Sequence, residues 1–197
     1  MKTLTYTSTK DIHNLTWPEV EHDVGLYTPA LRVFTDFKDA SPRLIEPNVR
    51  AEVLVDIMKK EHVRMKIVVD SLNNFLGVVS LEDLSEEAFI KHIANGYVRD
   101  ELLAIDLMRP KEDLLAVTYK SLSNSDIESL IVSQKSNHHQ HLLVVDEETM
   151  SIRGLVSAND IVRQLQLNID VATSTSFAKL NDVLEHEYAN SKRIRVA

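Results

Sequence analysis

The sequence predicts an α/β fold (α+β in its layout) made of two copies of a β-α-β-β-α unit. Three segments of the first half recur in the second half in the same order, at offsets of 74 to 77 residues. Such a match indicates an internal duplication, which predicts two small, similar domains that pack on each other. The matched segments are 30–34 with 104–108, 67–70 with 143–146, and 77–83 with 154–160.

The first elements expected in each copy are a short strand and an amphipathic helix. Strands are expected at 43–46 and at 114–119. Helices are expected at 50–61 and at 125–136, because apolar residues recur there at the spacing of one helical turn. The apolar faces consist of Val53, Leu54, Ile57 and Met58 in the first helix, and of Ile127, Leu130 and Ile131 in the second.

A β-hairpin is expected after each of these helices. Its first strand is a continuous aliphatic run, too short for a helix and typical of a buried strand. Turn residues separate this run from a second strand. The four hairpin strands are expected at 67–70, 75–79, 143–146 and 152–156. A serine ends each hairpin, and we expect Ser80 and Ser157 to start the last helix of each copy.

The composition excludes several kinds of site. The chain has 197 residues, four glycines and no cysteine. It therefore lacks the glycine-rich phosphate loop, the dinucleotide fingerprint, thiolate metal sites and a thiol nucleophile. The net charge of −8 disfavours nucleic acid and anionic membranes as partners. No signal peptide or membrane segment is recognisable, so we expect a cytoplasmic protein.

The pattern Ser-x-x-Asp at 80–83 and at 157–160 has two interpretations. It can be a capping box, in which the hydroxyl and the carboxylate satisfy free backbone N–H groups at a helix start. It can also be a ligand site, since a helix N-terminus and a hydroxyl bind phosphate while a carboxylate binds ribose hydroxyls. Gly77 and Gly154 in the preceding strands would then let a base or sugar approach the backbone closely.

The aliphatic-Val-Val-Asp segments, the turns and the two Gly-x-x-Ser-x-x-Asp motifs together resemble tandem CBS domains, which are named after cystathionine β-synthase. The resemblance covers about residues 30–168. It implies a disc-like pair of β-α-β-β-α domains with a pseudo-twofold axis and two clefts between the copies. It also implies that the discs commonly form homodimers, and that the clefts of many members bind AMP, ADP, ATP or S-adenosylmethionine.

The resemblance assigns roles to residues of this chain. Asp83 and Asp160 would bond the ribose of a ligand. Ser80 and Ser157 would meet its phosphate or ribose side.

The first strands of the two copies would contact the base. These contacts would come from Arg43 to Ile45 and from 114–117. The sequence departs from the family pattern just upstream of Val-Val-Asp, where Lys66 and Leu142 stand near the place of a frequent proline.

A run of histidines contains the densest cluster of metal-ligating side chains. His138, His139 and His141 could supply three imidazoles to zinc. Neighbouring side chains in a strand point to opposite faces, so we favour a polar loop that enters a strand and expect no metal site. No catalytic constellation is recognisable, and we expect no enzymatic activity.

The flanks complete the expected organisation of the chain. We divide it into an N-terminal arm at 1–29, domains at 30–100 and 101–169, and a C-terminal helix and tail at 170–197. The arm has one apolar anchor, Trp17-Pro18, and the tail carries three basic residues, Lys192, Arg193 and Arg195. The helix is expected at 175–190, with Phe177, Leu180, Val183, Leu184 and Tyr188 on one face, which packs either on its own domain or on a dimer partner.

Three functions remain open from the sequence. The leading hypothesis is a non-enzymatic regulatory protein that senses an adenine nucleotide between its two domains and transmits occupancy through a homodimer or a regulated protein. The second is a scaffold or interaction module whose clefts bind no ligand. The third is an enzyme or metal protein that uses the histidine run.

Overall fold

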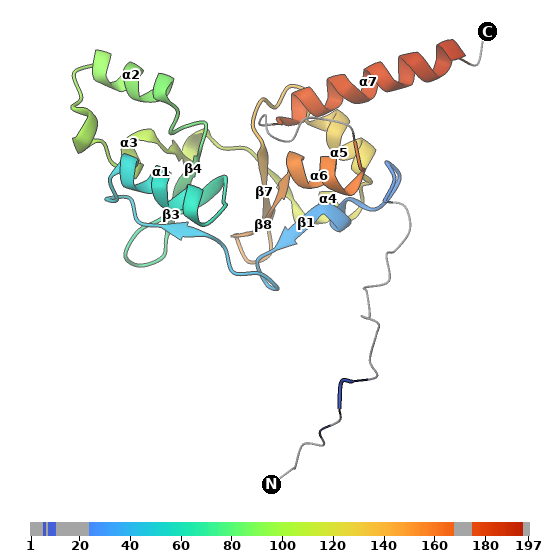
Figure 1. Cartoon of the computed structure of the whole chain (residues 1–197), viewed down its shortest axis with the longest axis horizontal. Coiled ribbons are helices and arrows are strands. Elements are labelled where there is room, and N and C mark those ends of the chain that lie inside the picture. Colours follow the sequence, from blue (N-terminus) through green and yellow to red (C-terminus); the bar gives the residue numbers. More distant parts are fainter. Residues whose placement is uncertain (1–5, 7, 11–23, 168–174, 195–197) are drawn as a thin grey trace.

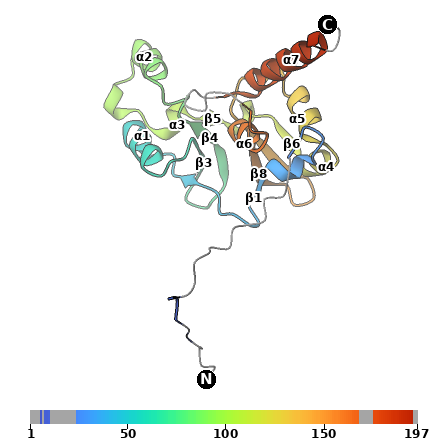
Figure 2. The same cartoon turned by 45° about the vertical axis from the view of Figure 1, so that its right-hand side comes forward.

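The computed structural model describes residues 6, 8–10, 24–167 and 175–194, with side chains placed up to residue 186 in the last segment. It contains two four-stranded sheets, and helices lie on the outer side of each (Figures 1 and 2). The strands are β1 (Phe34–Asp36), β2 (Leu44–Ile45), β3 (Met65–Val69), β4 (Phe75–Ser80), β5 (Arg109–Pro110), β6 (Ala116–Thr118), β7 (His141–Asp146) and β8 (Ser151–Ser157). The α-helices are α1 (Ala51–Lys60), α2 (Glu86–Ala94), α3 (Ala104–Leu107), α4 (Tyr119–Ser123), α5 (Ile127–Ser133), α6 (Ala158–Gln164) and α7 (Phe177–Ile194). Short 3-10 helices are η1 (Ala30–Val33), η2 (Arg99–Glu101) and η3 (Lys111–Asp113).

The predicted α/β fold with two similar units is confirmed. The first sheet has the order β2-β3-β4-β5, and the second has the order β1-β8-β7-β6. In each, a short strand pairs in parallel with the first hairpin strand, β2 with β3 and β6 with β7. The crossover between them contains a helix, α1 or α5, as the parallel connection requires.

The two sheets exchange their edge strands across the repeat. Strand β1, from the first half of the chain, pairs with β8 of the second sheet, and Asp36 lies opposite Gly154. Strand β5, from the second half, pairs with β4 of the first sheet, and Pro110 lies opposite Gly77. The division of the chain at residue 100 remains a prediction, and neither sheet is built from one side of it alone.

Gly77 and Gly154 lie where the exchanged strands cross. A β-carbon on Gly154 would overlap the carbonyl oxygen of Thr35 and lie 2.5 Å from the ring of Phe34. A β-carbon on Gly77 would overlap the carbonyl oxygen of Arg109 and lie 3.0 Å from Cα of Pro110. The backbone that approaches these glycines is therefore that of the neighbouring strand. Their expected ligand contact stays a prediction.

The core has three parts. Two of these parts each lie between a sheet and its helices. The first is built around Leu54, Met58 and Phe89, and the second around Ile131, Ile161 and Phe177. The third joins the inner faces of the two sheets. It consists of Met65, Ile67, Val69, Val78 and Leu143.

Two local predictions were wrong. Ser80 does not start a helix, because a turn follows it and α2 begins only at Glu86, where the Ser85 hydroxyl accepts a hydrogen bond from the backbone N–H of Ala88. Val53 does not belong to the buried face of α1 and is 48% exposed. Ser157 does precede α6 directly, although its hydroxyl does not cap that helix.

The predicted C-terminal helix is confirmed as α7. Its buried residues Phe177, Leu180 and Leu184 belong to the core of the second unit, so this helix packs on its own chain, against α5 and α6. The side chains of Tyr188, Lys192 and Arg193, as well as Trp17, Pro18 and Arg195, lie outside the described part. Among the described helices none is long and apolar enough to cross a membrane.

An arginine on β8 holds the exchanged strand β1 in place. Arg153 donates hydrogen bonds to Oδ2 of Asp36, at 3.0 and 3.2 Å, and lies 3.6 Å from the ring centroid of Tyr119. It also faces Asp146 at 3.5 Å. The hydrogen bond from Arg153 contributes most to lowering the pKa of Asp36.

Replacing Arg153 with methionine is expected to lower the free energy of unfolding by about 2 kcal/mol, since charge-assisted bonds and a cation–π contact are lost together. Urea denaturation would measure this loss. Lys135→Met, at an exposed position on the same unit, serves as the control. Equal stability of the two variants would contradict a role for Arg153 in holding β1.

Candidate functional site

Two clefts open at the same end of the inter-sheet core and share Met65 and His141, and the repeat relates part of their linings. We call them cleft A and cleft B. Cleft A, of about 510 Å³, combines 62–65 of the first copy with residues of β8 and α6 from the second. Cleft B, of about 730 Å³, combines His138, His139, His141 and 114–117 of the second copy with Val78 and Arg109. The segments 62–65 and 138–141 occupy equivalent places, just before or at the start of the first hairpin strand.

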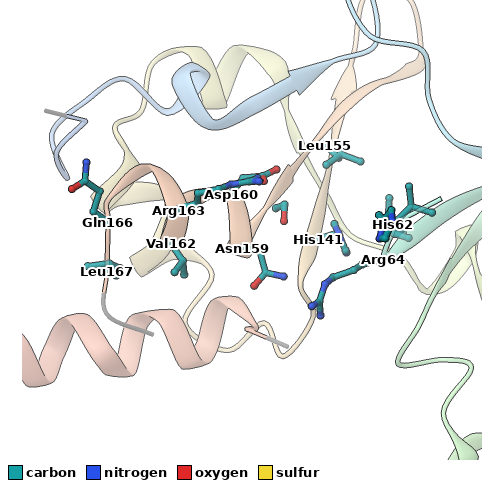
Figure 3. A pocket seen from close by; sticks show the side chains of 13 residues that line it. His62, Arg64, His141, Leu155, Asn159, Asp160, Val162, Arg163, Gln166 and Leu167 are labelled. Atoms are coloured by element: carbon teal, nitrogen blue, oxygen red, sulfur yellow. The ribbon is translucent and has the colours of Figure 1, made fainter. Parts of the chain in front are cut away.

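Cleft A gathers polar groups from both copies. Ser157 ends β8, and Asn159 and Asp160 lie in the first turn of α6. From the other side the segment before β3 contributes Arg64, whose side chain extends towards His141 and Asn159 in Figure 3. The cleft is therefore formed only when the two copies pack together.

Two buried polar atoms in cleft A have no hydrogen-bond partner among the described residues. They are Oδ1 of Asn159 and Nδ1 of His141. Nearly all buried polar side-chain atoms in proteins are hydrogen-bonded, so each of these atoms needs an explanation. Asn159 lines cleft A, and His141 lines both cleft A and cleft B, so both atoms lie beside space that the two copies enclose.

The electrostatics of cleft A favour a neutral histidine beside two cations. Burial lowers the pKa of His141 to about 4, and the charges of Arg109 and Arg64 act in the same direction. His141 is therefore uncharged near neutral pH, and its Nδ1 is either a donor or an acceptor. Arg64 and Arg163 supply positive charge to the cleft, against the single carboxylate of Asp160.

The carboxylate of Asp160 is more accessible than its counterpart in the first copy. Asp160 is 33% exposed and pairs with Arg163 one turn further along α6. Arg163 is itself 75% exposed, so this pair competes with water and contributes little to stability. A ligand could therefore replace Arg163 as the partner of Asp160 with little loss of stability.

The equivalent carboxylate, Asp83, is engaged within the fold through its Oδ2 atom. Its Oδ2 accepts hydrogen bonds from the backbone N–H and the hydroxyl of Ser80, at 2.8 and 2.6 Å. Arg109, which lines cleft B, also approaches it at 3.4 Å. Next to it, Glu82 accepts a hydrogen bond of 2.7 Å from Nε2 of the buried Gln140 and so links the two copies. The Ser-x-x-Asp motif of the first copy is thus a closed turn.

The predicted site residues fall in different places. Ser157 and Asp160 line cleft A, and 114–117 line cleft B. Ser80 and Asp83 line neither cleft. The strand between Arg43 and Ile45 contributes to neither cleft, and its central residue Leu44 lines a separate groove at the hairpin ends. Arg43 and Ile45 line neither cleft, so their expected contact with a base stays a prediction.

Lys66 lies in the first sheet near the predicted base site. It is 4% exposed, and its Nζ lies 2.7 Å from Glu61 and 3.5 Å from the carbonyl oxygen of Leu44. The departure from the family pattern thus places a buried lysine beside β2, paired with a Glu61 side chain that is 42% exposed.

Sequence reasoning missed His62 and Arg64, which line cleft A together with Ser157 and Asp160. It singled out His138 and His139 only as metal ligands, and the structure places both in the lining of cleft B. The signal was present, because 62–65 and 138–141 match at the offset of 76 residues that relates the first hairpin strands. No group of three or more metal-ligating side chains is brought together among the described residues.

Comparisons with known proteins agree with the fold. Residues 36–89 match the family model of the CBS domain. No curated protein matches the sequence.

Three solved structures share the fold. An uncharacterized conserved protein from Pyrococcus horikoshii has a TM-score of 0.54 at 13% identity, over 74% of this chain and 98% of that chain. A CBS-domain-containing protein from Agrobacterium tumefaciens has a TM-score of 0.52 at 16% identity, over 77% and 98% of the two chains. CBSX2, a CBS-pair protein of Arabidopsis thaliana, in complex with AMP has a TM-score of 0.50 at 22% identity, over 73% and 99%.

Proposed function

We propose that this chain, which has the tandem CBS fold and carries a CBS domain over residues 36–89, is a non-enzymatic regulatory protein that binds one adenosine-containing nucleotide in cleft A. The observation that carries the proposal is the pair of buried, unpartnered atoms, Oδ1 of Asn159 and Nδ1 of His141, beside Ser157 and Asp160. Asp160 would accept hydrogen bonds from the ribose hydroxyls, as the family pattern implies.

The charge of cleft A favours a phosphorylated ligand. Arg64 and Arg163 would neutralise phosphate oxygens, and arginine binds phosphate with strong, directional hydrogen bonds. S-adenosylmethionine carries a positive sulfonium and gains less from two neighbouring arginines. Among the ligands of the family, AMP, ADP and ATP therefore fit cleft A better, and the similar structure of CBSX2 contains AMP.

Cleft B is the weaker candidate. The carboxylate equivalent to Asp160 already has the hydroxyl and backbone N–H of Ser80 and the guanidinium of Arg109 as partners. A ribose would have to displace these bonds, which are internal to the fold and partly buried. We therefore expect one nucleotide per chain.

Occupancy of cleft A would act through the arrangement of the two copies. Since the cleft consists of residues from both, a ligand binds best to one relative position of the units and shifts the population towards it. We expect the protein to be a cytoplasmic homodimer that passes this shift to a regulated protein.

Changing Asp160 to asparagine is expected to raise the dissociation constant for AMP about tenfold or more, or about 1.4 kcal/mol, because two ribose hydroxyls lose a charged acceptor. Isothermal titration calorimetry with AMP, ADP, ATP and S-adenosylmethionine would measure affinity and stoichiometry. The matched variant Asp83→Asn should leave the affinity for AMP unchanged in protein that remains folded.

Other outcomes would redirect the assignment. If none of these ligands binds folded protein at millimolar concentration, the scaffold function is favoured instead. If Asp83→Asn weakens binding and Asp160→Asn does not, the nucleotide lies at the Ser-x-x-Asp motif of the first copy and outside cleft A. A stoichiometry of two would contradict the closed state of the first-copy motif.

A further inference from the structure

A third cavity, which we call the hairpin groove, lies at the opposite end of the inter-sheet core from clefts A and B. Its volume is about 1010 Å³. Both hairpins contribute to it at matching positions of the repeat, with Val69 and Phe75 on one side and Val145 and Ile152 on the other. Phe37 from the loop after β1 and Leu44 from β2 close it. The groove therefore lies on the pseudo-twofold axis and shares no lining residue with either cleft.

The walls of the groove are mostly apolar, and the uncharged polar residues Asn73, Asn74 and Ser151 also line it. Phe37, Phe75 and Ile152 pack on the inter-sheet core but remain only partly buried, because the sheets do not meet fully at this end. Leu44 is 41% exposed and Met150 is 87% exposed. A concave, mostly apolar cavity of this size matches the ~300–1,000 Å³ range of sites that bind small molecules.

The charge of the groove separates it from the nucleotide clefts. Asp146 and Glu147 lie on its rim, and none of the described residues that line it is a lysine, arginine or histidine. Arg153 contacts Asp146 from outside the groove and balances that one carboxylate. A phosphate or carboxylate in the groove would thus be repelled by Glu147 and would find no cationic side chain in the lining.

From this combination of apolar walls and an acidic rim, we propose that the hairpin groove is a second ligand site, which binds an uncharged or cationic apolar small molecule and excludes anions. The site is independent of the proposed nucleotide binding, because none of its residues lies in cleft A. Burial of a ring system between the two phenylalanines would supply the affinity, and Glu147 would supply the selection by charge.

Two fluorescent probes with the same ring system test both parts of the proposal. N-phenyl-1-naphthylamine is uncharged, and 8-anilino-1-naphthalenesulfonate carries a sulfonate. We expect the full-length protein to bind the uncharged probe about tenfold or more tightly than the sulfonate. We expect Glu147→Lys to narrow this ratio by strengthening binding of the anionic probe.

Matched variants locate the probe. Leu44→Trp should fill the groove from its exposed edge and weaken binding of the uncharged probe about tenfold. Leu72→Trp, at an 80% exposed position in the neighbouring turn, should leave it unchanged. Asp160→Asn should also leave it unchanged, because Asp160 lies in cleft A.

Three results would overturn the proposal. Equal probe affinity in Leu44→Trp and the wild type would place the probe elsewhere. Equal affinity for the two probes would remove the selection by charge. Probe binding that falls as protein concentration rises would show that a second copy of the chain covers the groove.

Discussion

Replacing Gly154 with alanine is expected to lower the free energy of unfolding by about 3 kcal/mol, at the upper end of the usual cost of overpacking. The added methyl group would overlap the carbonyl oxygen of Thr35 and lie 2.5 Å from the Phe34 ring. The first of these atoms is backbone in a paired strand, so the clash cannot be relieved by a change of rotamer. Strand β1 would have to move away from β8, and the hydrogen bonds of Arg153 to Asp36 would be strained with it.

Chemical denaturation of Gly154→Ala beside Gly25→Ala would measure this effect. No atom lies within 4 Å of a β-carbon built on Gly25, so its substitution should change stability by no more than about 0.5 kcal/mol. If Gly154→Ala were as stable as Gly25→Ala, the close crossing of β1 over β8 would be wrong.

The two repeated glycines show what sequence reasoning could and could not reach. Their matching positions revealed the duplication, because a motif of fixed spacing is visible in the chain itself. The atoms that require them belong to Thr35 and Arg109, each from the other half of the chain. A contact between strands so distant in sequence leaves no local pattern, so the sequence alone does not show which atoms require the missing side chain.

The same distinction holds for the candidate site. Ser157 and Asp160 were found because their spacing repeats, and the structure places them in a cleft. Ser80 and Asp83 have the same spacing but a different environment, since Arg109 arrives from β5 and closes the motif. Identical motifs thus have different exposure, which depends on the packing of the two copies.

As the pH falls from 6.5 to 4, the lowered pKa of His141 is expected to decrease the free energy of unfolding of the wild-type protein by up to about 3 kcal/mol. Its pKa is lowered to about 4 in the folded state, chiefly because burial penalises the charged imidazolium. The unfolded chain binds a proton near pH 6.5, whereas the folded protein resists protonation until about pH 4. The contribution of His141 to stability is therefore fully present above pH 6.5. It falls as the pH decreases through this window and changes no further below pH 4.

Other charged groups act on His141, and His139, whose pKa burial also lowers, changes stability with pH in the same direction. Arg109 and Arg64 oppose protonation and Asp83 favours it, and the two arginines stay charged throughout. Carboxylates with lowered pKa values, such as Asp36, lose their contribution only at lower pH. Stability measured against pH in His141→Gln should decline less between pH 6.5 and 4 than in the wild type. His138→Gln, which removes an exposed histidine three residues away, should retain the wild-type slope, and parallel curves for all three proteins would show that the His141 ring is accessible to solvent.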